Sequence, residues 1–272
     1  MVLHAYPTEQ RAHVLRDRVR LSMGQLAPIG FSEQWLLKDA GDRHWALIAG
    51  ALGQERSVFR DGTGRPVYAA FCATWLELSR PGLTLLGEDA EILSTLSSPG
   101  GSCLASVHVV SVRGEVRARL TMISTFVSHD DSGSNRRVCR NGLMDERLPA
   151  LPVSGPDVMA LHQRARSVLR TQRGRQIAGP VALRVTPVPG LDFNAVGLLY
   201  FPTFSRLAET ASWQADPQIG PLAAREVVYL GNIDQGEEIA VFVDGAEQYL
   251  VRGDGRVLGY CRTNRDPRTT QG

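Results

Sequence analysis

The sequence predicts an α+β fold built from two similar units. Each half of the chain places an apolar helical segment before a series of β-rich segments, and glycine and proline turn signals separate the β-rich segments. An antiparallel sheet wrapped around one central helix in each unit satisfies this pattern, and two such fused units form a double hotdog fold. We expect an N-terminal hotdog in residues 1–147 and a C-terminal hotdog in residues 148–272.

The N-terminal half is predicted to begin with a short helix within residues 8–24. Ser32 is a suitable N-cap for the next helix, Gly41 marks a break, and a second short helix follows over residues 44–52. Segments rich in β-branched and aromatic residues then predict a meander of strands. These strands cover residues 65–78, 84–96, 102–112 and 116–127.

The second half is predicted to follow a polar loop over residues 128–142 and a proline-containing linker, Leu148–Pro156. A helix over residues 154–169 begins this half, and residues 183–213 combine a strand with a helix. Residues 225–264 are typical of three strands joined by turns at Asp234–Gly236, Gly245 and Gly253–Gly255, with Tyr260 at the end of the last strand. The order of the first half is therefore repeated.

Composition narrows the function classes. A formal net charge of +2 argues against a dedicated nucleic-acid binder, which usually carries a clustered basic face. No segment approaches the roughly 20 apolar residues that span a bilayer, and the N-terminus lacks a secretory pattern, so we expect a cytoplasmic protein without a membrane partner. Lys38 is the sole lysine among 30 basic residues, which codon bias or a need for phosphate recognition would explain.

The sequence shows no metal or redox motif. The four cysteines are scattered without a CxxC pair, and no HxH or HExxH spacing is present. Cys72 and Cys103 lie in apolar strand patterns, where a thiol behaves as a small hydrophobic group. We therefore expect no metal and no cofactor.

Several segments carry a resemblance to a known family. GFSEQWLLKDAGDRHWALI, VYAAFCATW, FNAVGLLYFPTF, REVVYLGNID and the loop GSNRRVCR are spread over most of the chain. Together they resemble the bifunctional acyltransferase/decarboxylases of leinamycin-type polyketide biosynthesis. That resemblance implies a double hotdog enzyme that decarboxylates methylmalonyl-CoA and transfers the propionyl group to the phosphopantetheine of an acyl carrier protein.

The resemblance also implies that a tyrosine accepts the acyl group, and the matching position is Tyr68. A phenol has a pKa near 10, so Tyr68 needs a nearby base or positive potential to react. His44, Arg65 or a helix N-terminus are candidates for that role. The backbone N–H groups of Gly30, Phe31 and Ser32 are expected to stabilise an enolate oxygen, as the start of a central helix does in hotdog proteins.

Further candidates each have two interpretations. His44 is either a packed histidine or a site residue, and Asn194 either forms a turn or donates to a thioester oxygen. Glu33 is either a general base or a first-turn helix charge. Trp35 either packs in the core or walls an acyl pocket. The others are Thr203 and Ser205, which cap the second helix or line the pocket, and Asn135 and Arg136, which contact phosphates or are solvated.

Two other function classes remain open. A thioesterase on the same fold would need a positioned carboxylate such as Glu33 or Glu209. A dehydratase would normally carry a histidine on the central helix, and FSRLAETASW has none. These two enzymes of the same fold form one class, and a non-catalytic binding module is the other. Because the two halves can pair internally, a monomer is as consistent with the sequence as a homodimer.

Overall fold

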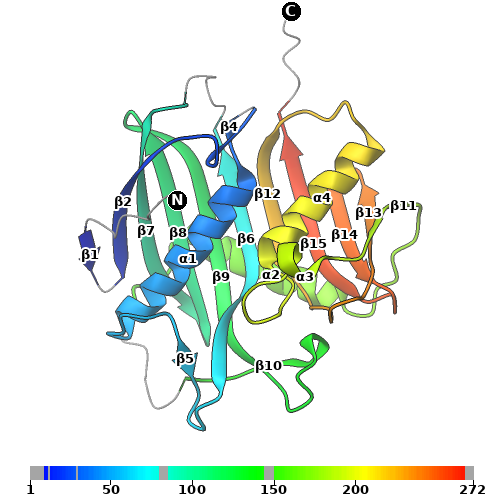
Figure 1. Cartoon of the computed structure of the whole chain (residues 1–272), viewed down its shortest axis with the longest axis horizontal. Coiled ribbons are helices and arrows are strands. Elements are labelled where there is room, and N and C mark those ends of the chain that lie inside the picture. Colours follow the sequence, from blue (N-terminus) through cyan, green and yellow to red (C-terminus); the bar gives the residue numbers. More distant parts are fainter. Residues whose placement is uncertain (1–8, 12, 29, 80–84, 144–149, 267–272) are drawn as a thin grey trace, which may run out of the picture.

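The computed structural model describes residues 9–11, 13–28, 30–79, 85–143 and 150–266 (Figure 1). Within them, thirteen strands form one antiparallel sheet, and β3 (Leu26–Ala27) and β4 (Gly30–Phe31) form a separate pair. The first half contributes β1 (Glu9–Arg11), β2 (Val14–Arg20), β5 (Phe59–Arg60), β6 (Pro66–Leu78), β7 (Asp89–Gly100), β8 (Cys103–Val112), β9 (Glu115–His129) and β10 (Val138–Arg140). The second half contributes β11 (Val181–Val185), β12 (Leu222–Tyr229), β13 (Ile239–Asp244), β14 (Glu247–Arg252) and β15 (Val257–Arg265).

The strand order shows an internal symmetry. The main path runs β1-β2-β7-β8-β9-β6-β12-β15-β14-β13-β11, so beyond β1 the second half repeats the first in reverse. The strand that follows each central helix, β6 or β12, meets its counterpart at the centre. They pair antiparallel from Ala224↔Glu77 to Val228↔Ala73. One sheet therefore joins the two units through their equivalent strands.

Each half of the sheet packs against its own helix on one face (Figure 1). Helix α1 (Glu33–Ala51) covers the first half, with Leu36, Leu37 and Leu47 nearly inaccessible to solvent. Helix α4 (Phe201–Ala215) covers the second half and buries Phe204 and Leu207. This is the predicted double hotdog arrangement.

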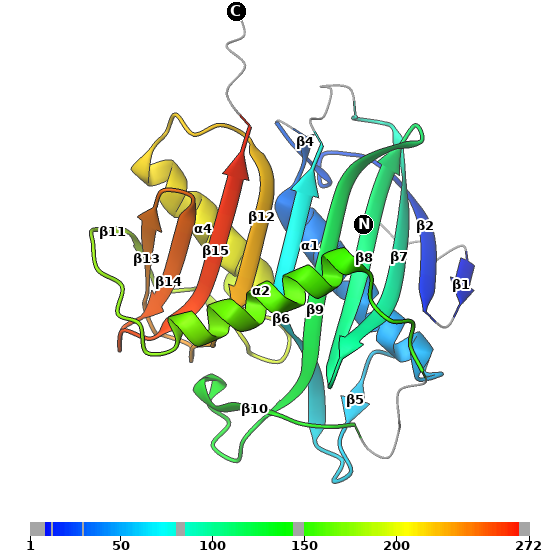
Figure 2. The ribbon, with the colours of Figure 1, turned by 180° about the vertical axis from the view of Figure 1, so that it is seen from behind.

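A third long helix, α2 (Pro156–Gln172), lies on the opposite face of the sheet, where it crosses from one half to the other (Figure 2). Its Val158, Leu161 and Ala165 pack against Ala73 and Val228, on the two central strands. The predicted second-half helix is thus present, but it is a connecting helix and does not occupy the centre of a hotdog. The short helix α3 (Pro189–Asp192) precedes α4.

The helix expected in residues 8–24 is wrong, because Val14–Arg20 forms β2. Arg16, Arg18 and Arg20 are exposed, whereas Leu15 is buried. Successive side chains of a strand point to opposite faces of the sheet. The arginines at every second position of this segment are therefore typical of a strand.

Three further boundaries differ from the expectation. Gly41 does not break the first central helix, which runs without interruption to Ala51. The segment 225–264 contains four strands, and the last continues past Tyr260 to Arg265. The predicted unit boundary at residues 147–148 lies outside the described residues. No helix in the described part of the chain is long and apolar enough to cross a membrane.

Candidate functional site

A cavity of about 760 Å³ lies where the two halves of the sheet meet. The β6–β12 ladder ends at Ala73↔Val228, and β5 pairs only with Pro66 and Val67. Among the described strands, none pairs with Tyr68–Cys72 on the edge of β6 that faces the second half. The cavity uses this opening and is lined by residues of both units.

The cavity walls come from both faces of the sheet. Phe71 packs with the α1 core, and its ring lies 4.4 Å from that of Phe201 at the start of α4. Cys72 and Cys103 pack with the α2 core on the other face. Burial raises the pKa of Cys72 to about 12, so this thiol stays protonated at neutral pH and is a poor nucleophile. Much of the lining is therefore apolar and unreactive.

Tyr68 lies at the opening. It is half-buried, lines the cavity and pairs with Val127 on β9. Its ring makes an edge contact with the ring of His129, with the centroids 5.9 Å apart. The predicted acyl acceptor is thus in a cavity, beside a histidine that sequence reasoning did not select.

Asn194 lines the same cavity from the second half. Its Oδ1 accepts hydrogen bonds from the backbone N–H groups of Val196 (3.1 Å) and Leu198 (3.0 Å), so Asn194 forms the turn that was one of its two predicted interpretations. This turn fixes the orientation of the amide, because only Oδ1 can accept. No described residue accepts from its Nδ2 group, which therefore remains available as a donor.

Asn135 also lines the cavity and is 8% exposed. Its Nδ2 donates to the carbonyl oxygens of Gly197 (2.7 Å) and Ile233 (2.8 Å), which ties the loop before β10 to the second half. Its Oδ1 must then accept from His129 Nε2, at 2.9 Å. This assignment places a proton on Nε2 and, in the neutral ring, leaves Nδ1 as a proton acceptor.

His44 lies elsewhere. It is fully buried, and its Nδ1 and Nε2 are each 2.7 Å from a serine hydroxyl, of Ser106 and Ser124 respectively. Burial lowers the pKa of His44 to about 3. His44 therefore stays neutral inside the first hotdog, and it is not among the residues that line the cavity.

The start of α1 also lies outside the cavity lining. The side chain of Ser32 caps the helix by accepting from Trp35 N at 3.3 Å. The rings of Phe31 and Trp35 stack 5.8 Å apart against the first core, and Gly30 pairs with Ala27 in the β3–β4 pair. The residues that the cavity receives from α1 are instead Gly41, Asp42 and Trp45.

Three further predicted residues have structural contacts outside the cavity lining. Glu33 forms an ion pair with the buried Arg225, at 3.3 Å. The backbone oxygen of Ser205 accepts from Arg225 at 2.7 Å, and Thr203 Oγ1 donates to the backbone oxygen of Asp192 at 3.2 Å. These residues hold α1 and α4 in place.

Arginines are prominent in the cavity lining. Arg136 pairs with Glu237 in a loop of the second half, and Arg252 pairs with Asp254. The lining also includes three arginines that were not among the predicted site residues, Arg140, Arg166 and Arg256. An excess of arginine in the whole chain gave no means of selecting them, because their proximity depends on tertiary packing.

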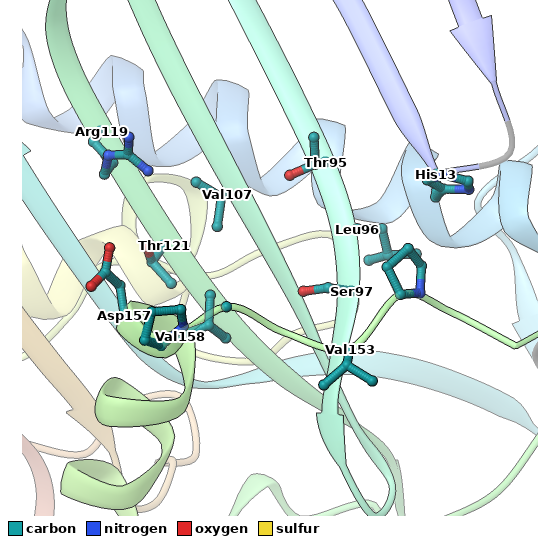
Figure 3. Close-up of a pocket in the computed structure, with 13 residues that line it drawn as sticks. His13, Thr95, Leu96, Ser97, Val107, Arg119, Thr121, Val153, Asp157 and Val158 are labelled. Atoms are coloured by element: carbon teal, nitrogen blue, oxygen red, sulfur yellow. The ribbon is translucent and has the colours of Figure 1, made fainter.

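A second, smaller cavity of about 370 Å³ lies between β7–β9 and the start of α2. Figure 3 shows Arg119, Thr121 and Asp157 toward one end and His13 at the other. Its lining includes both an arginine and a carboxylate, and none of the predicted site residues belongs to it. The larger cavity is therefore the candidate site.

No protein-family model and no curated protein matches the chain in sequence. Solved structures do match. The 12:0-ACP thioesterase from Umbellularia californica has a TM-score of 0.67 and 12% identity over 96% of this chain and 99% of its own. A putative oleoyl thioesterase from Lactobacillus plantarum has a TM-score of 0.58 and 12% identity over 94% and 97%. An acyl-ACP thioesterase from Bacteroides thetaiotaomicron has 0.56 and 10% over 92% and 96%.

These similarities extend over nearly the full length of each chain, so both hotdog units and their connection are shared. At 10–12% identity they establish the fold and not the reaction. The double hotdog fold predicted from the order of elements is confirmed.

Proposed function

We propose that this protein is an acyltransferase that moves an acyl group from a coenzyme A thioester to the phosphopantetheine thiol of an acyl carrier protein, with decarboxylation of a methylmalonyl-type donor. The observation that carries this proposal is the shared cavity, which is lined by Tyr68 from the first half and Asn194 from the second. The family resemblance and the thioester substrates named for the structural neighbours support it.

Tyr68 acts as the acyl acceptor in this proposal. Its oxygen attacks the thioester carbonyl, the carbon–sulfur bond breaks, and coenzyme A leaves as a thiol after receiving a proton. The carrier-protein thiol then attacks the tyrosyl ester and restores the phenol. The amide Nδ2 of Asn194 is the uncommitted donor that would stabilise negative charge on the carbonyl oxygen.

His129 supplies the proton acceptor that a phenol requires. Its Nε2 is committed to Asn135, so Nδ1 is the atom that takes the proton from Tyr68 and returns it to the departing thiolate. The ring contact with Tyr68 places the two side chains together. Asn135 is a positioning residue here, because it fixes the tautomer through two backbone carbonyls of the second half.

Decarboxylation needs a different environment from acyl transfer. Loss of CO₂ from a methylmalonyl thioester leaves an enolate, which takes a proton at carbon to become a propionyl thioester. Apolar surroundings favour this step because a localised carboxylate is poorly solvated there. The rings of Phe71 and Phe201 and the methyl group of Ala69 provide such a wall.

A thioesterase is the alternative, and one observation favours a specific residue for it. Asp42 is the one carboxylate among the described residues that line the cavity, and its side chain is exposed. It could activate water against a thioester or against the tyrosyl ester. Glu33 and Glu209 are poor candidates, because both are held in ion pairs with Arg225.

Incubation with methylmalonyl-CoA followed by mass spectrometry of the intact protein tests the proposal. We expect a propionyl adduct on Tyr68, and its transfer to a holo carrier protein added afterwards. Tyr68→Phe should abolish both and leave the fold unchanged, since only one hydroxyl is lost. His129→Gln should slow adduct formation by roughly 10²–10⁴-fold, the usual contribution of a general base.

Tyr260→Phe is the matched control, because that hydroxyl bonds to Glu247 and Tyr260 is not part of the cavity lining. It should transfer the acyl group normally. Free propionate or methylmalonate without an adduct, lost in Asp42→Asn, would establish the thioesterase instead. Normal carrier-protein loading by Tyr68→Phe would exclude Tyr68 as the acceptor.

A further inference from the structure

The charged side chains of the cavity have a clear sign. The described lining contains Asp42 as its one carboxylate and five arginines, Arg136, Arg140, Arg166, Arg252 and Arg256. Arg136 and Arg252 are neutralised by ion pairs with Glu237 and Asp254. Arg140 and Arg166 are exposed and form no ion pair with a described carboxylate. The cavity therefore presents uncompensated positive charge, which favours an anionic ligand.

Arg140 and Arg166 come from separate elements but line the same cavity together with Cys103. Burial raises the pKa of the Cys103 thiol, and the positive charges of both arginines oppose that rise. Arg140 pairs with Val127 on β9, two positions from Thr125, which pairs with Cys103. Ala165, the neighbour of Arg166, packs in the same cluster as Cys103. Arg140 extends from β10 and Arg166 from α2, and these elements flank the same region of the sheet in Figure 2.

The helix α2 turns one continuous face to the cavity. His162, Ala165, Arg166 and Leu169 all line it, and their spacing is that of neighbours on a helix surface. Leu169 is a half-exposed apolar residue beside the arginine, at 48% exposure. The pair of arginines thus sits where a largely apolar cavity meets solvent, which suits a long ligand with an apolar end and an anionic end.

We propose that Arg140 and Arg166 form a clamp for the phosphate of a phosphopantetheine arm. The same clamp receives the arm of the coenzyme A donor and, after coenzyme A leaves, the arm of the carrier protein. This inference rests on the proposed function, which supplies two successive substrates with this phosphate in common. Arginine suits the task because its planar group binds phosphate oxygens through two parallel hydrogen bonds.

Calorimetric titration with 4′-phosphopantetheine and with pantetheine, which lacks the phosphate, tests the clamp directly. We expect the wild-type protein to bind 4′-phosphopantetheine about 10-fold or more tightly than it binds pantetheine. The double variant Arg140→Gln/Arg166→Gln should lose this preference while its affinity for pantetheine is unchanged. Arg170→Gln is the matched control, since Arg170 is exposed on α2 but does not line the cavity.

A wild-type protein that binds both compounds equally, or a double variant that keeps the preference, would overturn the clamp. A variant that loses affinity for coenzyme A but not for phosphopantetheine would also overturn it, because the arginines would then bind the nucleotide part. Sharing is tested with steady-state kinetics, where KM for the acyl-CoA and for the holo carrier protein should rise together. A rise in only one of them contradicts sharing.

These titrations use no thioester, so they are independent of catalysis. Failure to find an acyl adduct on Tyr68 would leave the clamp standing, and loss of the phosphate preference would leave the acceptor role of Tyr68 untouched. Both arginines are exposed, so the double variant should fold normally, and its thermal unfolding temperature should match that of wild type.

Discussion

At the residue scale, histidines divide into two chemical groups according to their partners. His44 and His108 belong to a buried chain in which the hydroxyl of Ser106 lies 2.7 Å from both rings, and Ser94 and Ser124 end the chain. Each neutral ring donates from one nitrogen and accepts at the other, so the chain is satisfied without charge. His129 instead has no hydrogen-bond partner for Nδ1 among the described residues, and its ring contacts that of Tyr68. Burial therefore keeps His44, the histidine predicted as a site residue, in its neutral form.

The buried histidine chain predicts a loss of stability in acid. Burial lowers the pKa of His44 to about 3 and that of His108 well below its usual range, so the unfolded chain binds more protons. The two neutral histidines contribute fully to the free energy of unfolding above about pH 6.5. This contribution declines as the pH falls toward the pKa of the folded state. Between pH 6 and 5 the free energy of unfolding should fall by up to about 1.4 kcal/mol per pH unit for each histidine.

Denaturant unfolding at a series of pH values measures this slope. In the folded protein, the imidazole NMR signals of His44 and His108 should show no titration between pH 7 and 5. A titration midpoint for His44 near 6.5 would contradict the neutral chain.

At the element scale, two phenylalanines of α4 pack against glycines, one glycine in each half of the chain. A Cβ atom on Gly41 of α1 would lie 2.9 Å from the ring of Phe201, and one on Gly259 of β15 would lie 2.5 Å from the ring of Phe204. Gly41 therefore permits close approach of the two central helices. The sequence pattern was interpreted as a helix break because glycine is a poor helix former. The reason for the glycine lies in its partner 160 residues away.

This contact makes an unusual prediction for Gly41→Ala. In a helix interior this change normally stabilises by up to about 1 kcal/mol. Here the added methyl group meets an aromatic ring, so we expect destabilisation of about 1–3 kcal/mol. In a Phe201→Leu background, where the ring is gone, the same change should become neutral or stabilising. Urea unfolding of the four proteins gives the coupling, and additive effects would rule out the steric explanation.

At the scale of the whole molecule, the two ends of the β6–β12 ladder differ in chemistry. Glu33 begins α1 as Phe201 begins α4, and Gly41 and Glu209 each lie eight residues further on. On one side Phe201 packs against Gly41 beside the cavity. On the equivalent side Arg225, at 1% exposure, pairs with Glu33 and Glu209, and Glu209 also pairs with Arg265 at 2.7 Å. An approximately symmetric fold thus has a cavity on one side and a buried ion cluster on the other.

The ion cluster should hold the two halves together. Desolvation raises the pKa of Glu33, and the nearby charge of Arg225 opposes this. Arg225→Met leaves the buried carboxylate without its partner, so we expect a loss of about 3–5 kcal/mol in the free energy of unfolding. Arg184→Met breaks an exposed pair with Glu238 and should change stability by less than about 1 kcal/mol. Equal effects in the two variants would refute a structural role for the cluster.

The amino-acid sequence by itself determined the order of elements and the double hotdog class, because helix and strand periodicities are local properties of the chain. It also led us to predict Tyr68, through the family resemblance, and Asn194 as site residues, and both line one cavity. It did not determine that β6 and β12 separate after Ala73↔Val228, that His129 contacts Tyr68, or that Arg140 and Arg166 line the same cavity. Sheet pairing and helix packing decide these contacts between distant residues, and no local pattern encodes them.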